Sequence, residues 1–258
     1  MAFRARFRNA TVYFLSMPLL ELDNVTRHFG GLTAVDHVSL NVEQGELLGI
    51  AGPNGSGKST LFNIITRIPF GVSSGSIRFK GQTITNLAAH KIARMGVVRT
   101  FQKDAEFPDL TARETIALAA HFSKQVPASD VNRNVDEKLA LVRFEKSRAD
   151  YLTTNLSVYE RKQLMIASAL VMQPSVVMLD EPASGLSKPE ISELGELLKI
   201  INKSGVTVIL IEHVLSLLLS VAERLVVLNQ GAVLAEGNPQ EVIKNQQVID
   251  AYLGSRSA

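Results

Sequence analysis

Apolar and polar positions divide the chain into three stretches. Before residue 105 and after residue 172, short apolar runs with the length of buried strands alternate with helical patterns. Between them helical periodicity dominates and strand-like runs are missing. Alternation of strands and helices is typical of an α/β sheet with crossover helices. We therefore expect an α/β core formed by 17–104 and 173–258, with a helical insertion at 105–172.

Strand-like runs can be located on both sides of the insertion. The early ones are LLELDNV (19–25), VSLNVEQGELLGIAG (38–52) and GSIRFKGQTI (75–84), and a short helix at AAHKIARMG leads into VVRTF (97–101). From residue 175 onward the predicted strands lie in SVVMLDEP, VTVILIEH and VVLNQGAVLAEG.

The most apolar region, 206–228, predicts a strand, an amphipathic helix and another strand. Four side chains interrupt it, namely Glu212, His213, Glu223 and Arg224. A membrane-spanning helix needs about 20 predominantly apolar residues with few charges. We therefore expect no spanning helix in this region.

Composition and charge exclude several classes of protein. The chain has 258 residues, 46% of them hydrophobic, which is enough for one large domain with a sizeable core. It has no cysteine, and therefore no disulfide and no cysteine-based metal site or nucleophile. The net charge is only +2, and three of the arginines lie in residues 1–16, so no basic field points to nucleic acid. We expect 1–16 to be a disordered extension, or translation to start at Met17.

The clearest chemical motif is GPNGSGKS at 52–59, which fits the phosphate-binding pattern G-x-x-x-x-G-K-[ST]. A predicted strand precedes it and a helix follows. Glycines let the backbone approach a phosphate, whose charge then faces backbone N–H groups and the helix N-terminus. Lys58 would bridge the β- and γ-phosphates, and Ser59 would bind Mg²⁺. The expected nucleotide-binding residues here are Gly52, Pro53, Asn54, Gly55, Ser56, Gly57, Lys58, Ser59 and Thr60.

Polar residues at the ends of three other predicted strands fit the same chemistry. Asp180 would hold Mg²⁺, and Glu181 beside it could polarise the attacking water. Gln102 can hydrogen-bond a Mg²⁺-bound water and the nucleophilic water, which makes it a metal and catalytic candidate. His213 could donate a hydrogen bond to the γ-phosphate as charge develops. Open α/β sheets bind ligands at the carboxyl ends of their strands, where all four residues fall.

Taken together, these residues resemble the ATP-binding subunits of ABC transporters over nearly all of 19–254. The motifs that carry the resemblance are the Walker A loop 52–59, the Q-loop residue Gln102, the signature region 156–160, Walker B 176–181, the D-loop 184–187 and the H-loop residue His213. The segments that look closer still to the G-type ATPase of branched-chain amino acid importers are RHFGGLTAVDHVSL (27–40), ARMGVVRTFQ (93–102), ILIEH (209–213) and GNPQEVIKNQQVIDAYLG (237–254).

The resemblance implies a P-loop NTPase fold, an ABC-type nucleotide-binding domain with an antiparallel β subdomain and a helical insertion. It implies hydrolysis of ATP with Mg²⁺, coupled to permease switching at the cytoplasmic face of the membrane. The implied partners are a second ATPase subunit, membrane permeases and, indirectly, an extracytoplasmic solute-binding protein. Phe29 falls at the A-loop position, where an aromatic ring stacks on adenine. The partly aromatic stretch 101–116 is the expected coupling surface for the permease.

The signature region departs from the family pattern L-S-G-G-Q. The aligned residues are Leu156, Ser157, Val158, Tyr159 and Glu160, so neither glycine is present. The resemblance implies that Ser157 acts in trans, on the γ-phosphate held by the partner subunit. Ser157 and Glu160 fit a capping box at a helix start. Tyr159 would place a ring where bare backbone should approach the phosphate, and Glu160 would add a like charge that costs on the order of 1–4 kcal/mol.

Two interpretations of this region stay open, a working signature and a capped helix that has lost the function. Ser187 of the D-loop also departs from the usual Asp or Asn but keeps a capping box with Glu190. Both departures fall on the composite site that uses the partner's Walker A loop. A heterodimer with one competent site is therefore our hypothesis, beside a homodimer.

Alternative functions are also compatible with the sequence. A non-transport ABC ATPase of DNA repair or translation would usually need a long coiled coil or two fused ATPase domains. A regulatory ATP-binding switch is favoured by the altered signature and opposed by Glu181. An importer would take its specificity from other chains, so urea, amides or other small solutes are alternatives to branched-chain amino acids.

Overall fold

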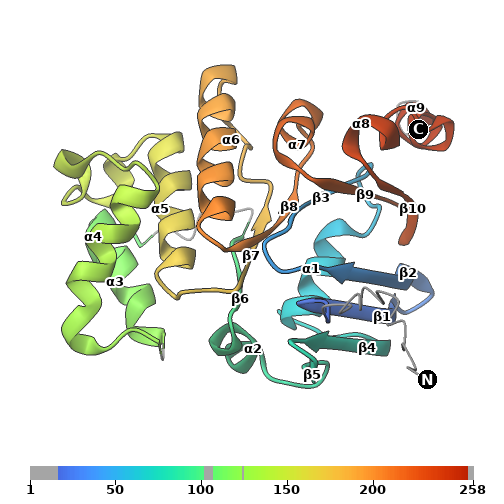
Figure 1. Ribbon diagram of the computed structural model, residues 1–258, viewed down its shortest axis with the longest axis horizontal. Coiled ribbons are helices and arrows are strands. Elements are labelled where there is room, and N and C mark those ends of the chain that lie inside the picture. Colours follow the sequence, from blue (N-terminus) through green and yellow to red (C-terminus); the bar gives the residue numbers. More distant parts are fainter. Residues whose placement is uncertain (1–16, 102–106, 124, 255–258) are drawn as a thin grey trace, which may run out of the picture.

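The described part of the chain consists of two sheets with their helices and a separate group of helices (Figure 1). The computed structural model describes residues 17–101, 107–123 and 125–254. The expected extension at 1–16 and the Q-loop residue Gln102 lie outside the described residues.

The first sheet has four antiparallel strands in the order β2-β1-β4-β5. Its strands are β1 (Leu20–Phe29), β2 (Leu32–Val42), β4 (Ser74–Phe79) and β5 (Gln82–Thr83). The strand-like run at 38–52 does not form one strand. A turn with Gly45 at φ 80° interrupts it, and the carboxylate of Glu46 accepts the N–H of Glu43 at 2.9 Å there. The run therefore contributes β2 to this sheet and β3 to the other.

The second sheet has six strands in the order β10-β9-β3-β8-β7-β6, all parallel except the edge strand β10. The strands are β3 (Leu47–Ala51), β6 (Val97–Arg99), β7 (Val176–Asp180), β8 (Thr207–Ile211), β9 (Arg224–Asn229) and β10 (Ala232–Gly237). Every residue of β3, β7 and β8 is buried, as expected for parallel strands covered on both faces.

The two faces of this sheet belong to different apolar cores. Leu48 and Ile50 of β3 pack with the antiparallel sheet and with α1, whereas Leu47 and Ala51 pack with helices on the opposite face. The helices of the α/β part are α1 (Lys58–Thr66), α2 (Ala89–Met95), α6 (Lys188–Lys203), α7 (Leu215–Val221), α8 (Pro239–Val242) and α9 (Gln246–Gly254).

The segment between β6 and β7 is helical. Its helices are α3 (Ala112–Phe122), α4 (Val131–Leu141) and α5 (Val158–Leu170), with short 3₁₀ turns at Ala128–Asp130, Lys146–Arg148 and Thr153–Asn155. The three helices pack on one another and stand to one side of the sheets (Figure 1). The predicted fold class, an α/β domain with an antiparallel β subdomain and a helical insertion, is thus confirmed.

The apolar region at 206–228 folds as strand β8, helix α7 and strand β9, as predicted. Within the described ranges no helix is both long and apolar enough to cross a membrane. Strands β3, β7 and β8 run parallel and side by side, so their carboxyl ends meet at one edge of the sheet. Asp180 is the last residue of β7, and the phosphate loop and Glu212 directly follow β3 and β8.

Candidate nucleotide-binding and catalytic site

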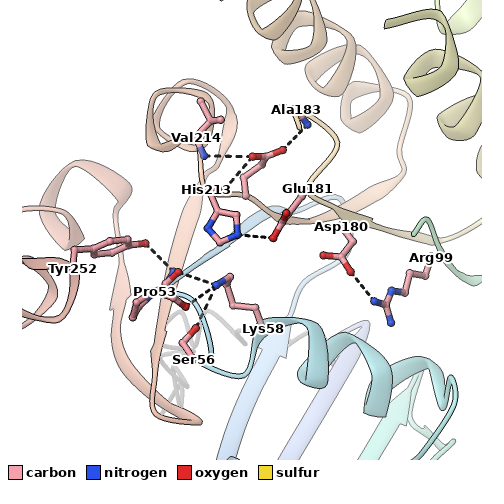
Figure 2. A network of polar contacts seen from close by, with 12 residues as sticks. Pro53, Ser56, Lys58, Arg99, Asp180, Glu181, Ala183, His213, Val214 and Tyr252 are labelled. Atoms are coloured by element: carbon pink, nitrogen blue, oxygen red, sulfur yellow. Dashed lines mark hydrogen bonds and ion pairs between the residues drawn. The ribbon is translucent and has the colours of Figure 1, made fainter. Parts of the chain in front are cut away.

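The loop between β3 and α1 closes around the ammonium group of Lys58 (Figure 2). Lys58 Nζ donates to the carbonyl oxygens of Gly52 at 2.8 Å and Pro53 at 3.0 Å, and lies 3.5 Å from Ser56 Oγ. Lys58 is 5% exposed. A cation held by the carbonyls of its own loop gives that loop a defined curvature before any ligand binds.

Two glycines of this loop are required by the protein's own backbone. Gly52 has φ 148°, and a Cβ there would lie 2.2 Å from the carbonyl oxygen of Leu228 in β9. Gly57 has φ 102°, and its Cβ would lie 2.4 Å from the carbonyl oxygen of Ala34 in β2. Of the three glycines expected to make room for phosphate, only Gly55 has no atom within 4 Å of such a Cβ. Close packing against β2 and β9 is therefore a second reason for the glycine pattern.

A cavity of about 530 Å³ lies over the phosphate loop. It brings together predicted residues that are far apart in the sequence. The residues that line it are Phe29, Leu32, Thr33, Ala34, Asn54, Gly55, Ser56, Gly57, Lys58, Ser59, Thr60, Glu181, His213 and Gln230. Ser157 is not among them and lies at the start of α5 in the helical group.

Phe29 lies at the end of β1 and is 39% exposed. Phe70 packs edge-on against it, with 4.9 Å between ring centroids, and the guanidinium carbon of Arg27 lies 4.7 Å from its ring. Such contacts fix the orientation of an aromatic ring. The part of Phe29 that stays exposed lines the cavity, where a planar base can stack on it.

Asp180 ends β7 and is paired with an arginine from β6. Its Oδ2 accepts from Arg99 Nη2 at 2.6 Å (Figure 2). Arg99 Nη1 donates to Asn63 Oδ1 at 2.5 Å. Both members of the pair are almost completely buried. A buried carboxylate needs an opposite charge of this kind. The second oxygen, Oδ1, is buried without a hydrogen-bond partner in the described part of the chain, so it is free to hold a cation or a cation-bound water.

Glu181 and His213 face each other across the ends of β7 and β8. Glu181 adopts φ 51°, an uncommon conformation for a residue with a side chain, and its backbone N–H donates to Ile211 O at 2.9 Å. Its Oε1 lies 2.5 Å from Nε2 of His213. The two predicted catalytic side chains are therefore brought into direct contact at the cavity.

Glu212 holds the loops on which this pair sits. Its carboxylate accepts the N–H groups of Ala183 at 2.6 Å, His213 at 3.1 Å and Val214 at 3.4 Å. Burial raises the pKa of Glu212, and these N–H groups act in the opposite direction. The carboxylate thus ties the segment after β7 to the segment after β8.

Burial lowers the pKa of Lys58, and the carboxylates of Glu181 and Asp180 oppose this effect. Nearby negative charge favours the charged form of a lysine. An anionic ligand in the cavity would act in the same direction as the two carboxylates. The site is thus suited to a phosphate group.

At the signature region the predicted capping box forms at the start of α5. Glu160 N–H donates to Ser157 Oγ at 3.2 Å, and Ser157 N–H donates to Glu160 Oε2 at 2.6 Å. Arg148 also donates to both oxygens of Glu160, at 2.7 and 3.0 Å, and lowers the pKa of Glu160 to about 2. Glu160 is therefore paired with Arg148, which compensates its charge, and the expected repulsion of a phosphate in a dimer stays a prediction.

Tyr159 does not occupy the open end of α5. Its half-buried ring packs against the apolar core, and its hydroxyl lies beside Glu193 of α6. Burial raises the pKa of Tyr159. The exposed residues at this end are Ser157 and Val158. We expected the ring of Tyr159 to lie where a phosphate approaches. Instead, the ring packs toward α6.

The D-loop serine keeps the predicted cap as well. Glu190 Oε2 accepts the backbone N–H of Ser187 at 2.7 Å and its hydroxyl at 2.6 Å. This contact fixes the start of α6, directly after the loop that leaves Glu181.

Sequence reasoning missed several side chains that shape the site. The sequence contained a sign of Arg99 and Glu212, because each is a charged residue in or next to an apolar run that forms a buried strand. It contained no sign of Arg148, because a loop separates Arg148 from Glu160 and the path of that loop cannot be predicted from the sequence. Tyr252 of α9 was also missed, and its hydroxyl accepts the N–H of Gly52 at 2.8 Å.

We expect the substitution Glu160→Gln to reduce stability in a pH-dependent way. The folded-state pKa of Glu160 is lowered from 4.5 to about 2, so its stabilising contribution is fully present above pH 4.5 and is lost as the pH falls toward 2. Because water screens part of the pair, we expect a loss on the order of 1–2 kcal/mol at pH 7. Urea denaturation of both proteins from pH 7 to pH 3 measures the difference, which should shrink on acidification.

The matched control is Glu137→Gln, which removes an exposed carboxylate 3.9 Å from Arg133 on α4. Its effect should stay within about 0.5 kcal/mol at every pH. A loss at Glu160→Gln that is independent of pH would contradict the charge-based account.

Comparisons with known proteins cover most of the chain. The model of a family described as ABC transporter matches residues 35–184, and one described as Branched-chain amino acid ATP-binding cassette transporter matches residues 232–258. The high-affinity branched-chain amino acid transport ATP-binding protein BraF of Pseudomonas aeruginosa is 38% identical, over 93% of this chain and 99% of its own length. The corresponding protein LivG of Escherichia coli K12 is 37% identical over the same shares.

Solved structures give the same picture. A nucleotide-free ATP-binding cassette from an ABC transporter superposes with a TM-score of 0.82 at 27% identity, over 92% of this chain and 99% of that one. An ATP-binding cassette in its ADP conformation gives 0.83 at 27% identity, over 93% and 100%. Since the family model covers both the phosphate loop and Asp180, and the relatives align over almost their full length, the chain belongs to the ABC transporter family of ATP-binding cassettes, which are ATPases.

Proposed function

We propose that this chain is the ATP-hydrolysing subunit of an importer for branched-chain amino acids. The observation that carries the hydrolytic part is the contact between Glu181 and His213, 2.5 Å apart in the cavity that the phosphate loop lines. Support for the substrate class comes from residues 232–258, which match the branched-chain transporter model, and from the similarity to BraF and LivG.

In the proposed reaction the backbone of 52–59 and Lys58 hold the phosphates of ATP, while Phe29 stacks on the adenine. Glu181 orients and polarises the water that attacks the γ-phosphate. His213 keeps Glu181 in place and donates to the γ-phosphate as negative charge builds up. Catalysis of phosphoryl transfer depends mainly on such positioning and charge stabilisation.

The residues present fit a Mg²⁺ ion. The unpartnered Oδ1 of Asp180 is a buried hard oxygen donor, and Ser59 lies on the cavity wall. We assign Asp180 and Ser59 to the ion, with the predicted Gln102 beyond the described residues. When bound, Mg²⁺ would neutralise charge on the β- and γ-phosphates. Arg99 would keep the carboxylate of Asp180 in its orientation.

The start of α5 supports a second ATPase subunit as a partner. A helix N-terminus attracts an anion through its free N–H groups and its dipole. Ser157 is exposed there, Glu160 is neutralised by Arg148, and Tyr159 is packed aside. These contacts favour a working signature over a lost one, acting on the γ-phosphate bound by the partner.

A groove on the helical group supports permease binding. It is apolar, has a volume of about 230 Å³, and lies between α3 and α5. Phe107, Leu118 and Phe122 on its wall are 44%, 36% and 62% exposed. Exposed apolar patches of this kind mark protein interaction sites. Part of the predicted coupling stretch 101–116 borders the groove through Phe107 and Thr115.

The proposed complex lies at the cytoplasmic face of the membrane. This chain would be peripheral there, bound to the permeases and paired with the second ATPase. The solute-binding protein would act on the opposite side and contact the permeases alone. Closure of the ATPase dimer on ATP and its reopening after hydrolysis would drive the permease between its two states.

The substitution Glu181→Gln tests the proposed catalytic role. It keeps the size of the side chain but removes the carboxylate, so we expect ATP turnover of the assembled complex to fall about 100-fold or more. Affinity for ATP should change less than about threefold, because Lys58 and the loop are untouched. Phosphate release and equilibrium ATP binding measure the two effects. Glu223→Gln, at an exposed acid, is the control, and turnover of Glu181→Gln close to wild type would refute the assignment.

The substitution Tyr159→Gly tests the state of the signature. Because the ring packs against the core, we expect the variant to lose about 2–3 kcal/mol of stability through lost packing and a glycine in a helix. We expect no increase in ATP turnover of the complex. Tyr159→Phe, which keeps the ring, should behave like wild type in both measurements. A gain of turnover in Tyr159→Gly would show that Tyr159 blocks the signature.

The substitution Phe122→Ser tests the groove as the permease contact. The ring is the most exposed apolar side chain on the groove wall, so its loss should weaken assembly with the permeases at least about tenfold. ATP binding by the chain itself should not change. Co-purification of the complex measures assembly, and Leu253→Ser, at a residue 57% exposed in α9, is the control. Equal recovery of all three complexes would place the permease elsewhere.

A further inference from the structure

The C-terminal helix α9 contacts the phosphate loop through one side chain (Figure 2). The hydroxyl of Tyr252 accepts the backbone N–H of Gly52 at 2.8 Å, between residues that are 200 positions apart. The ring is partly buried, and it lines an apolar pocket with Leu225 and Val227 of β9 and Val248 of α9. Packing of α9 at the β10 edge of the sheet therefore delivers the hydroxyl to the loop.

Both backbone polar groups of Gly52 are hydrogen-bonded. Its N–H is bound by Tyr252 and its carbonyl oxygen by Lys58 Nζ, at 2.8 Å in each case. Lys58 is also the group assigned to the phosphates, so its bond to the carbonyl competes with ligand binding. The bond from Tyr252 does not involve the ammonium group of Lys58. It is therefore the contact that can hold the first residue of the loop throughout the nucleotide cycle.

The hydroxyl is suited to this role. Burial raises the pKa of Tyr252, although the hydrogen bond from Gly52 opposes the effect. The group is thus neutral at physiological pH and places no negative charge near the phosphates. Nor can a side chain on Gly52 replace the contact, because the space for a Cβ is filled by Leu228 and Ser56.

We propose that Tyr252 is a positioning residue of the phosphate loop, and that nucleotide affinity depends on the docking of α9 through it. The inference rests on the proposed assignment of residues 52–59 to the phosphates. Without the hydroxyl, the Gly52 N–H loses its partner and the loop is less well ordered before binding. Ordering the loop then becomes part of the free energy of binding, which weakens affinity.

The test is calorimetric titration of the full chain with ADP and Mg²⁺, which involves no turnover. Tyr252→Phe removes the hydroxyl and keeps the ring, so we expect the Kd for ADP to rise about tenfold. Binding stoichiometry should stay at its wild-type value, and the thermal unfolding midpoint should fall by only a few degrees, because the variant loses a single hydrogen bond. Amide exchange at Gly52 should become faster while exchange in β3 does not change. Tyr151→Phe makes the same chemical change far from the loop and should leave the Kd unaltered.

A Kd for Tyr252→Phe within twofold of wild type would overturn the proposal. So would a lower stoichiometry at an unchanged Kd, since that pattern shows loss of folded protein rather than of loop order. Lys58→Ala separates this inference from the assignment of the loop. If Lys58→Ala binds ADP as tightly as wild type, the assignment itself fails, whereas tight binding by Tyr252→Phe alone refutes only the positioning role.

Discussion

Charged side chains almost completely removed from water meet where strands β3, β7 and β8 end. Lys58, Asp180 and Glu212 are 5%, 3% and 2% exposed. Ionised groups persist in such surroundings only when opposite charges or N–H groups compensate them. The adjoining loops are accordingly bent around these charges, one around the ammonium of Lys58 and another around the carboxylate of Glu212. Charge compensation thus gives the site its shape before ATP arrives, and such preorganisation is what phosphoryl transfer requires.

The sequence was sufficient for the layers of the fold and for the residues that end its strands. Short buried strands of a parallel sheet have a distinctive pattern, and the polar residue after each one marks the ligand-binding edge. It was insufficient at 38–52, where one strand-like run forms two strands that belong to different sheets. The polar residues 43–46 mark the crossing, but the strands on both sides of them bury apolar residues, so their composition did not show which sheet each strand joins. The turn depends instead on Gly45 and on the contact between Glu46 and Glu43.

The signature region shows a different limit. Alignment of Val158, Tyr159 and Glu160 with a family motif told us which residues replace the glycines, but not where their side chains lie. The ring of Tyr159 is placed by packing against α6, and the charge of Glu160 is compensated by Arg148. Both partners lie outside the motif. A substituted motif can therefore keep the local geometry of a helix start when its neighbours absorb the new side chains.

Strand β3 carries the phosphate loop, yet both strands that pair with it, β8 and β9, come late in the chain. A ribosome that adds about 5–20 residues per second completes the antiparallel sheet and helices α3–α5 well before those partners emerge. During synthesis the apolar strand β3 therefore has two unpaired edges, and the nascent chain is exposed to aggregation through them. A polypeptide whose translation ends within the helical insertion contains the motif GPNGSGKS but lacks strands β8 and β9, which hold the motif in place.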